Sequence, residues 1–446
     1  MEVDVLIIGG GAAGLMAAYG AAQVFEQENS GQKTIVLEKM PRPARKIMIT
    51  GKGRCNFTNV KNWNDFSPHI CTDRNFLHKA FFNLNPEKVV EFFSAQGVES
   101  VIERGDRAYP ASYKASDIVD ALERAATNSG AAIECEKQVR QVSHDEDGYK
   151  VECADGSVYL AKSLVIATGG LSYPSTGSSG DGYIFAEDLG HTIKACHPAL
   201  TALVPKGYKK MTSDLGLRLP KGLFNGHIDR GLPLTELGEQ LCGCSLKNVA
   251  VTLKNAKDTV GAEFGDLDFT DGGIEGPVGF KLSRDAVKCI LNGGQVKFII
   301  DLKSAVGTDK LARNISTLIE EGFRDIKKLL RKLLPSDIAE AFLKTNPGLS
   351  ESRSVNPKAL AAALKEWTFD ICGYVGYERC VVTAGGINTK EIIPKTMQSR
   401  VTPGLYMCGE VIDIDCDTGG YNLQCAFSTG FLAGQSAAKS ILRKQS

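Results

Sequence analysis

The stretch that decides the fold is Asp4-Val5-Leu6-Ile7-Ile8-Gly9-Gly10-Gly11-Ala12-Ala13-Gly14-Leu15. An apolar run leads into spaced glycines and then into an Ala-rich amphipathic segment, which predicts a strand, a tight turn and a helix. Gly9 permits the sharp turn, Gly11 lets the backbone approach a diphosphate, and Gly14 lets the helix pack closely on the strand. The helix N-terminus then offers unpaired N–H groups and a partial positive charge. The stretch therefore predicts the diphosphate-binding turn of a dinucleotide site.

A second apolar segment, Thr34-Ile35-Val36-Leu37, ends at Glu38, which follows Gly14 by 24 residues. This is near the spacing of about 20 residues that is typical of a ribose-binding carboxylate, so we expect Glu38 to hold the adenosine ribose hydroxyls. An ordinary strand-turn-helix corner is the alternative. The agreement of strand, turn, helix and acid favours dinucleotide binding, with NAD, NADP and FAD all still open.

Composition indicates a globular protein of two or three units, because 446 residues with 43% hydrophobic content can bury a large core. The 52 basic and 52 acidic residues cancel, so no global field favours nucleic acid or an anionic membrane. We expect no nucleic-acid partner and no membrane association, with local patches left open.

The cysteines predict a reducing compartment. All 13 are scattered without a disulfide framework, and the chain shows neither a signal-peptide pattern nor an apolar run approaching the ~18 residues of a membrane span. A cytoplasmic location is therefore expected. Cys242 and Cys244 with His227 are too few for a zinc site, so no metal is expected.

A glycine-rich basic loop follows the second strand, reading Gly51-Lys52-Gly53-Arg54-Cys55-Asn56-Phe57-Thr58-Asn59. Glycines alternating with cations and small polar residues predict close contact with an anionic ligand, as a second phosphate or flavin contact. A solvated basic loop is the alternative. For Cys55, the basic surroundings favour a lowered thiol pKa, but packing is the expected role.

Two later segments return to the same theme. Ser163–Gly170 is an apolar strand that runs into small residues, which again allows backbone close to a dinucleotide. Ser175–Gly182 is rich in glycine and hydroxyls. It predicts either a side-chain-capped helix after a flexible turn or a further cofactor contact, and both are left open.

The pattern of apolar residues changes twice in the middle of the chain. From residue 199 to about 303, alternation and turns predict a separate β-rich unit, as in Val249–Leu253 and Val296–Asp301. From 309 to 366, apolar residues recur at helical intervals with charges between them. This pattern predicts a small helical subdomain.

The C-terminal part contains a short strand, Val401–Glu410, that ends in Gly-Glu, followed by Thr418–Gln424 and an Ala/Gly-rich helix to Ser440. A carboxylate at a strand end suits a ribitol hydroxyl, and a helix N-terminus stabilises negative charge on a reduced ring. The pattern predicts flavin chemistry. The acids between these segments alternate as in an exposed turn, so calcium is not expected; they are Asp413, Asp415 and Asp417.

Together, Ile8–Gly14, Gly51–Asn59, Ser175–Gly182 and Gly419–Gln424 resemble the BaiN/YhiN-like family of bacterial FAD-dependent, NAD(P)-linked oxidoreductases, which includes aminoacetone-oxidase-like flavoproteins. The resemblance spans nearly the whole chain in the same order. It implies FAD and an α/β architecture, with a Rossmann-type FAD-binding domain, an inserted β-barrel-like domain and a small helical subdomain. The expected ranges are 1–196 and 391–446 for the FAD domain, 197–303 and 367–390 for the β-rich insertion, and 304–366 for the helices.

The resemblance also implies site residues. Glu38 is expected at the adenosine ribose, the backbone of Val139 at the adenine, and Glu410 at the ribitol. The predicted cofactor site comprises Gly9, Gly11, Ala12, Ala13, Gly14, Glu38, Lys39, Arg45, Lys46, Gly53, Arg54, Cys55, Asn56, Thr58, Val139, Ala167, Thr168, Gly169, Gly170, Gly409, Glu410, Gly420, Asn422, Leu423 and Gln424.

Two departures from the family pattern stand out. Ala44 occupies a position where the family usually has glycine or lysine, and the turn Thr270–Pro277 lacks the usual His and Ser. That turn belongs to the insertion. Inferences about the substrate are therefore weaker than the inference of FAD.

The leading functional hypothesis is hydride transfer through flavin N5 to a small organic substrate. The resemblance implies NAD(P)H-linked reduction of an enone such as a dehydro-bile acid, with NADH or NADPH as a transient electron donor. Oxidation of a small amine such as aminoacetone by O2 is the alternative. Zero net charge without a basic tail argues against a flavin-binding RNA-modifying protein, and the lack of a Cys-x-x-Cys pair argues against a redox sensor.

No catalytic residue is assigned. Tyr173 and Tyr421 lie near predicted flavin loops and are candidates for donating a proton to a developing enolate. A packed tyrosine bonded to backbone is the alternative for each. The substrate, the redox partner and the oligomeric state are left open.

Overall fold

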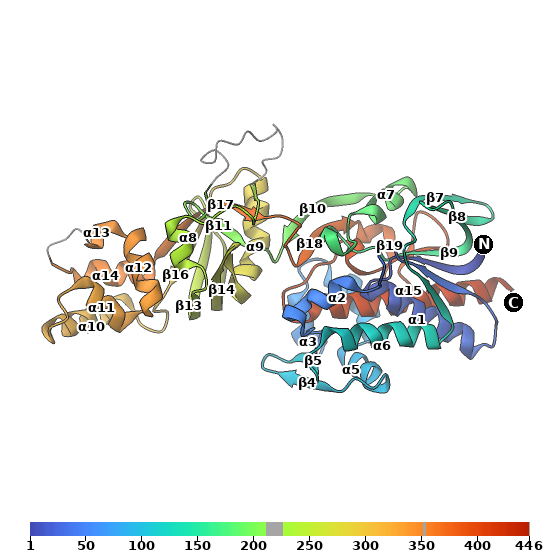
Figure 1. Cartoon of the computed structure of the whole chain (residues 1–446), viewed down its shortest axis with the longest axis horizontal. Helices are drawn as coiled ribbons and strands as arrows, with labels where there is room; N and C mark the ends of the chain where they lie inside the picture. Colours follow the sequence, from blue (N-terminus) through green and yellow to red (C-terminus); the bar gives the residue numbers. More distant parts are fainter. Residues whose placement is uncertain (211–225, 351–353, 446) are drawn as a thin grey trace. The chain divides into compact units, whose positions relative to one another are not determined.

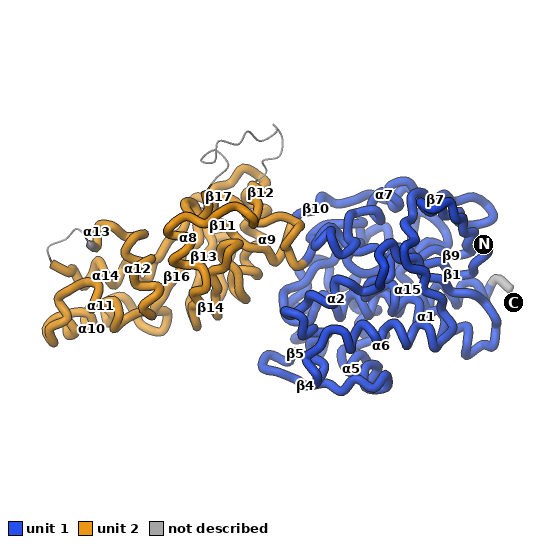
Figure 2. The backbone as a smooth tube through the Cα atoms, in the orientation of Figure 1, with its two compact units in different colours: residues 1–197, 382–446 blue, residues 198–381 orange. Residues whose placement is uncertain are grey.

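The chain divides into two compact units (Figure 2). The computed structural model describes residues 1–210, 226–350 and 354–445. Unit 1 combines Met1–His197 with Val382–Ser446, and unit 2 is the inserted segment Pro198–Val381. The cofactor residues predicted from both parts of the sequence therefore belong to one unit.

A mostly parallel sheet, with strand order β19-β20-β21-β9-β1-β2-β6, is the centre of unit 1 (Figure 1). β1 (Glu2–Ile8) pairs in parallel with β2 (Thr34–Leu37) and with β9 (Val158–Ile166). β6 (Ala131–Glu134) lies in parallel beside β2, and β21 (Leu405–Met407) beside β9. A strand from the C-terminal part therefore ends at the same sheet edge as β1.

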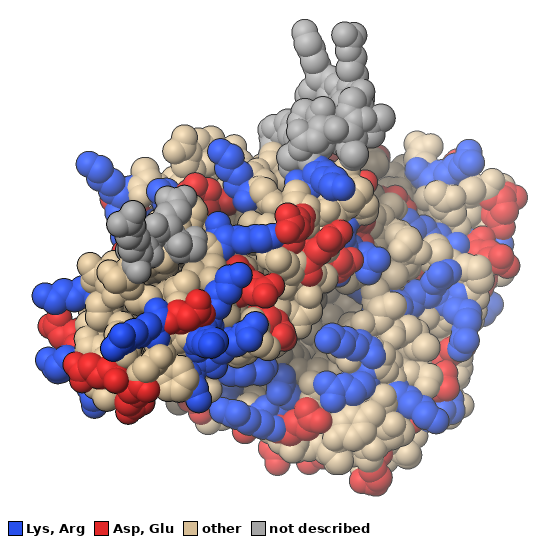
Figure 3. Space-filling model, turned by 60° about the vertical axis from the view of Figure 1, so that its left-hand side comes forward, with Lys and Arg blue, Asp and Glu red and all other residues tan. Residues whose placement is uncertain are grey.

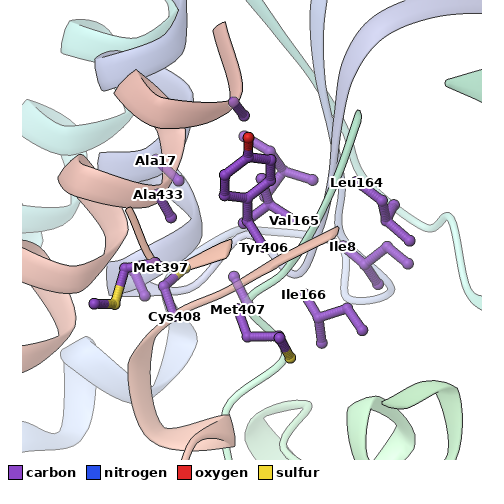
Figure 4. Close-up of a cluster of buried hydrophobic side chains, with 14 of the residues drawn as sticks. Ile8, Ala17, Leu164, Val165, Ile166, Met397, Tyr406, Met407, Cys408 and Ala433 are labelled. Atoms are coloured by element: carbon purple, nitrogen blue, oxygen red, sulfur yellow. The ribbon is translucent and has the colours of Figure 1, made fainter. Parts of the chain in front are cut away.

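The apolar runs of these strands form the core of unit 1. Ile8 pairs with Ile166, and Ile166 with Met407, so the three strands are in register at their carboxyl ends. All four residues of β2 and all three of β21 are buried. Figure 4 shows the cluster together with Ala17 and Ala433, which come from helices. Continuous burial along a strand is typical of a parallel sheet that is covered on both faces.

The helices α1 (Ala12–Gln27) and α15 (Tyr421–Gln445) meet at backbone contact. A Cβ added to Gly434 would lie 1.9 Å from the carbonyl oxygen of Ala17, and one added to Gly430 would lie 2.2 Å from that of Ala13. No side chain fits between the two helices at these positions. The residue numbers rise together along both helices, so α1 and α15 run parallel.

The remaining elements of unit 1 surround this sheet and helix pair (Figure 1). β7 and β8 continue antiparallel from β9, β3-β5-β4 form a small sheet, and β10 pairs with β18. Their bounds are α2 (Arg45–Ile49), α3 (Trp63–Phe66), α4 (Arg74–Asn83), α5 (Pro86–Ala95), α6 (Ala115–Asn128), α7 (Asp181–Asp188), β3 (Thr58–Asn59), β4 (Ser100–Glu103), β5 (Arg107–Pro110), β7 (Val139–Asp145), β8 (Gly148–Cys153), β10 (Ile193–Ala199), β18 (Val382–Ile387), β19 (Ile392–Ile393) and β20 (Gln398–Ser399), with 3-10 turns η1 (Thr50–Gly53), η2 (Ser67–His69), η3 (Pro174–Thr176), η4 (Thr389–Glu391) and η5 (Gly409–Val411).

Unit 2 contains a closed antiparallel barrel. Within its described residues, six strands follow the order β11-β15-β14-β13-β16-β17, and β11 also pairs with β17, which closes the ring; β12 adds in parallel to β17. Trp367 and Phe298 are buried in its core. The bounds are β11 (Leu203–Pro205), β12 (His227–Ile228), β13 (Ser245–Asn255), β14 (Asp258–Thr270), β15 (Gly273–Glu275), β16 (Val296–Asp301), β17 (Trp367–Val375), α8 (Glu236–Leu241) and α9 (Gly276–Leu291).

A group of helices lies between β16 and β17 in the sequence of unit 2. Its members are α10 (Thr308–Glu320), α11 (Ile326–Leu333), α12 (Ser336–Thr345), α13 (Pro347–Ser350) and α14 (Pro357–Lys365). Their apolar faces share one buried cluster with the barrel.

The predicted fold class is confirmed: a Rossmann-type α/β unit carries an inserted barrel and a small helical subdomain. One boundary differs from the expected range, because unit 1 resumes at Val382 rather than at 391. β18 pairs with β10 there. The sequence of a short apolar strand does not indicate which strand it pairs with. Among the described residues, every helix is too short or too polar to cross a bilayer.

The contact between α1 and α15 yields a stability prediction. Gly434→Ala should lower the free energy of unfolding by about 1–3 kcal/mol, because its Cβ overlaps backbone that cannot move without shifting a helix. Thermal unfolding of the FAD-loaded protein measures the effect. Gly348→Ala is the control, because an added Cβ there meets nothing within 4 Å, and its change should stay within about 0.5 kcal/mol. Equal melting temperatures for the two variants would contradict the packing argument.

Candidate functional site

The glycine turn after β1 has the geometry of a ligand-binding turn. Gly9 has φ 104°, and a Cβ there would lie 2.6 Å from the carbonyl oxygen of Ala167, while a Cβ on Gly14 would lie 1.8 Å from that of Gly9. Gly11 differs, because a Cβ there meets nothing within 4 Å. Gly11 is the N-cap of α1 and makes no side-chain capping bond. The first turn of α1 therefore presents its N–H groups to open space, as an anion site requires.

Glu38, directly after β2, lies beside this turn. Its Oε2 accepts a hydrogen bond from the Gly10 N–H and its Oε1 accepts one from the Met40 N–H, both at 2.8 Å. The side chain is buried, and burial raises the pKa of the Glu38 carboxyl above its ordinary value. Each carboxylate oxygen keeps a lone pair, so the held carboxylate can still accept ribose hydroxyls.

The neighbours of Glu38 bring a further predicted segment to the turn. The Nζ of Lys39 lies 2.7 Å from Asp181 Oδ2 and also contacts the Ser179 hydroxyl. The Lys137 N–H donates to the Glu38 carbonyl at 2.9 Å, which places β7 and its Val139 nearby. The N-cap of α7 is Gly180, which makes no side-chain capping bond. Of the two alternatives for Ser175–Gly182, the side-chain cap is therefore absent, while the Ser179 hydroxyl contacts Lys39, a predicted cofactor residue.

The strand end at Ala167–Gly170 is also tightly confined. A Cβ on Gly169, where φ is 74°, would lie 2.9 Å from Ser178 Oγ, and a Cβ on Gly170 would lie 2.6 Å from Thr383 Oγ1. Thr168 is held against Gly182, whose added Cβ would lie 2.0 Å from Thr168 Oγ1. Small residues are required here because other segments of unit 1 approach the strand end.

A charged network joins four separate segments of unit 1. Glu410 Oε2 accepts from Lys46 Nζ at 2.8 Å, and its Oε1 accepts from the Ser172 hydroxyl at 2.6 Å and the Thr383 N–H at 2.8 Å. Lys46 Nζ also donates to Ser172 Oγ at 2.8 Å. Glu410 and Lys46 were both predicted as cofactor residues, and the structure brings them together. Ser172 and Thr383 were not predicted.

At the start of α15, backbone and side chains leave a polar group without a partner. Gly420 has φ 96°, and a Cβ there would lie 2.5 Å from the Thr58 carbonyl and 2.8 Å from Asn56 Oδ1. Asn56 Oδ1 is buried and has no hydrogen-bond partner among the residues that the structure describes. A buried acceptor without a donor is costly. A bound group that carries an N–H or O–H would satisfy it.

Two predicted residues of α15 have their side chains bound to protein. The Asn422 amide holds the preceding loop, because its Oδ1 accepts from the Cys416 N–H and its Nδ2 donates to the Cys416 and Asp417 carbonyls. Gln424 is fully buried, accepts from the Thr58 hydroxyl at 2.5 Å and donates to the Leu84 carbonyl at 2.8 Å. Their side chains position this helix start, so a ligand there would contact backbone.

The offset between the two helix starts fits an extended dinucleotide. Ala13 lies opposite Gly430 and Ala17 opposite Gly434, so α15 begins eight residues before α1 in this alignment, or about 12 Å at 1.5 Å per residue. One helix end suits a diphosphate and the other the electron-rich edge of a flavin. With the open space at Gly11 and the unpartnered Asn56 Oδ1, the residues present fit FAD.

A histidine, a carboxylate and a tyrosine lie together at the start of α15. His69 Nδ1 is 2.8 Å from Asp417 Oδ2, and the Asp417 N–H donates to the His69 carbonyl at 2.9 Å. The His69 ring stacks on Tyr421 with centroids 4.3 Å apart. Tyr421 is buried, and this burial with the nearby Asp417 raises the pKa of its hydroxyl. The His69 side chain is 25% exposed, so this dyad is accessible.

The remaining predicted residues occupy different places. Cys55 is fully buried, and burial raises the pKa of its thiol to about 12, so it packs as expected and the basic loop does not activate it. The guanidinium of Arg54 lies 5.0 Å from the Tyr109 ring centroid and 3.7 Å from Glu103 Oε1. Tyr173 is half-buried with φ 51°. Ala44 adopts φ 54°, a conformation that explains glycine at this position in the family pattern.

Three residues of the site were not predicted from the sequence. Ser172 follows the Gly169-Gly170 pair closely enough to be suspected, but Thr383 and His69 lie in segments without a motif. Their partners are remote, since 348 positions separate His69 from Asp417. Such pairs follow from tertiary packing alone. Of the acid triplet, Asp413 pairs with Lys194 and Asp417 with His69.

Comparison with known proteins places this geometry in context. The family model described as HI0933-like protein Rossmann domain matches residues 3–436. A 3-dehydro-bile acid delta(4,6)-reductase from Clostridium scindens is 29% identical over 97% of this chain and 98% of its own length. A ribosomal RNA dihydrouridine synthase from Escherichia coli is 28% identical over 98% of this chain and 99% of its own. The solved structure of a 3-ketosteroid-delta4-(5alpha)-dehydrogenase from Rhodococcus jostii covers 98% of this chain and 97% of its own at 15% identity, with a TM-score of 0.47.

The buried carboxyl of Glu38 generates a pH prediction. Because its pKa is raised, Glu38 takes up a proton at a higher pH than an ordinary carboxyl and would then lose the charge-assisted bonds that we expect it to make to ribose. FAD affinity should fall as pH decreases through this raised pKa. Glu38→Gln should bind FAD about 10- to 100-fold more weakly near neutral pH, from about 1.5–3 kcal/mol, with a flatter pH profile.

Quenching of FAD fluorescence on titration into the apoprotein measures this affinity. The control is Glu187→Gln, which removes an exposed carboxyl of the same unit and should leave both the affinity and its pH profile unchanged. A Glu38→Gln protein with the wild-type pH profile would show that another group is responsible.

Proposed function

The chain belongs to the HI0933-like family, and on that premise we propose that it reduces a carbon–carbon double bond conjugated to a carbonyl, with NADH or NADPH as electron donor. The family resemblance expected from the sequence is confirmed, and the chain is an FAD-dependent oxidoreductase. The observation that carries the finer proposal is the match to a 3-dehydro-bile acid delta(4,6)-reductase over nearly the full length of both chains. A small enone is therefore the leading substrate class.

The reaction needs a hydride at one carbon of the double bond and a proton at the other. FAD, when bound, supplies the hydride. The proton is assigned to His69, whose ring is oriented by Asp417 at 2.8 Å. The Asp417 carboxylate fixes the orientation of the imidazole ring. Tyr421 supports the ring from its face at 4.3 Å, so it acts through packing rather than as the donor.

The protein's groups also explain how charge on the flavin is tolerated. The first-turn N–H groups of α15 have no partner within the helix, and the helix dipole adds a partial positive charge there. Asn422 and Gln424 hold this helix start in place through bonds to the 416–417 loop and to Thr58. A preorganised donor set favours a reduced, anionic ring without further rearrangement.

A second candidate substrate is uridine within ribosomal RNA. The specific observation is the full-length match to the Escherichia coli protein named a ribosomal RNA dihydrouridine synthase, at nearly the same identity as the bile acid reductase. The C5=C6 bond of uracil is conjugated to the C4 carbonyl, so it accepts a hydride and a proton as an enone does. One flavin site and one proton donor would serve both substrates.

A steady-state assay of the FAD-loaded protein tests the proposal. We expect oxidation of NADH or NADPH that depends on a 3-oxo bile acid with conjugated double bonds or, for the second candidate, on unmodified ribosomal RNA, with dihydrouridine detected by mass spectrometry. The preferred nucleotide identifies the donor. Peroxide release from a small amine without either acceptor would instead support the oxidase alternative and overturn the reductase proposal.

The role of His69 gives a separate prediction. His69→Gln and Asp417→Asn should each lower kcat about 10²–10⁴-fold, the range for loss of a general acid. Anaerobic reduction of the flavin by NAD(P)H should stay unchanged, because it does not use this proton. The control His78→Gln changes an exposed histidine of the same unit, and parallel losses in all three variants would contradict a catalytic His69.

A further inference from the structure

The strongest feature that this function leaves unexplained is the exposed side of α11 in unit 2. Leu329 and Leu330 are buried, and Ile326 and Leu333 are half-buried. At 3.6 residues per turn, the four helical cations fall within an arc of about 140° on the opposite side of the helix. All are exposed, as is the arginine that precedes the helix. This α11 cationic face consists of Arg324, Lys327, Lys328, Arg331 and Lys332.

These cations lack acidic side-chain partners in the part of the chain that the structure describes. Within the described ranges 1–210, 226–350 and 354–445, no acidic side chain forms a salt bridge with any of the five. Asp325, the nearest acid in sequence, caps the helix by accepting from the Lys328 N–H at 2.9 Å. Lys332 lies over the Phe323 ring at 4.9 Å. Two other surface lysines of unit 2 are paired, Lys247 with Asp266 and Lys344 with Glu236.

The arrangement is unfavourable for an isolated helix. Lys327 and Arg331 are four residues apart, as are Lys328 and Lys332, and like charges at this spacing repel. Figure 3 shows basic and acidic side chains interspersed over the face in view, which agrees with the zero net charge of the chain. A local run of five cations is therefore an exception to the general surface. Charges interact over a Debye length of about 8 Å at physiological salt. The five cations can therefore attract an anionic partner nearby even though the chain has no net charge.

We propose that the α11 cationic face binds the phosphate backbone of RNA. This inference rests on the second candidate function, reduction of uridine in RNA. Cations four residues apart along the helix are separated by about 6 Å of rise, which gives a regular row of charges suited to a chain of phosphates. Arg324 and Arg331 add guanidinium groups, which bind phosphate in a bidentate manner. Such contacts set position without reading sequence.

The same helix does not suit a membrane surface. A helix that lies on a bilayer inserts its apolar side chains between the lipids, but Leu329 and Leu330 are buried in the core that the helical subdomain shares with the barrel. An acidic protein would match the charge without needing the regular spacing. RNA is therefore the partner that the observations favour.

The test uses the full-length, FAD-loaded protein. The test variant is Lys327→Gln/Lys328→Gln/Arg331→Gln. The control variant is Lys257→Gln/Lys288→Gln/Lys358→Gln, which removes the same charge from exposed positions of unit 2. Fluorescence anisotropy measures binding of a labelled ribosomal RNA hairpin at several salt concentrations. Melting temperature and visible flavin spectrum establish that both variants are folded.

For the test variant we expect affinity for the hairpin about 10- to 100-fold weaker at low salt, and a plot of log K against log salt that is shallower by about two to three, at 0.7–0.9 per lost phosphate contact. The control should bind like the wild type. Wild-type protein that fails to bind RNA, or a test variant indistinguishable from the control, would overturn the proposal. The proposal would also be overturned if the test variant lost binding to phosphatidylserine vesicles or to polyglutamate rather than to RNA. The face would then bind a lipid or an acidic protein.

The catalytic readouts separate this proposal from the proposed function. If RNA is the substrate, the test variant should show a raised KM for RNA with unchanged kcat, and unchanged flavin reduction by NAD(P)H. RNA binding that depends on the α11 cationic face without any dihydrouridine formation would refute the second candidate function and leave the surface standing. Dihydrouridine formation with the same KM in both variants would refute RNA binding by the α11 cationic face and leave the second candidate function standing.

Discussion

Unit 1 depends on the absence of side chains between α1 and α15. Gly430 and Gly434 bring the later helix into backbone contact with Ala13 and Ala17 of the earlier one. Because these residues come from opposite ends of the sequence, one packing constraint joins the two halves of the predicted cofactor site. It also sets the offset of about 12 Å between the helix starts. An extended dinucleotide needs two anion-stabilising ends at a fixed separation, and close helix packing provides that separation.

The charged groups of unit 1 are held in place by other protein groups, independently of any ligand. Lys46 and Glu410 form a partly buried pair with Ser172 and the Thr383 N–H. Such a pair adds little net stability, because desolvation offsets much of the attraction. Its effect is positional, since it fixes α2, the loop that contains Ser172, η5 and β18 relative to one another. His69 and Asp417 follow the same principle at the start of α15, where a carboxylate orients a ring that would otherwise rotate freely.

The sequence predicted what depends on local backbone geometry. Gly9, Gly11 and Gly14 each occupy the distinct environment that their spacing indicated, and alternation in 199–303 indicated the β-rich insertion. Contacts between distant segments were not predictable. Gln424 lies in a recognisable motif, yet its side chain binds Thr58 and Leu84 of the protein. The barrel closes because β11 pairs with β17, and β10 pairs with β18. These pairings depend on strand register, which cannot be predicted from the sequences of such short strands.

The predicted cofactor site lies in unit 1, and unit 2 is the inserted segment. A cofactor site built from backbone contact and buried networks tolerates little change, so it can remain constant while substrates differ. Of the two departures from the family pattern, Ala44 lies in unit 1. The turn at Thr270–Pro277 lies in unit 2, where Arg230 pairs with Asp271 and Glu275. On the proposed function, both candidate acceptors, an enone and a uracil ring, would take the same hydride and proton at unit 1. On the proposed function, the charged surface of unit 2 would therefore be what distinguishes an RNA substrate from a small molecule.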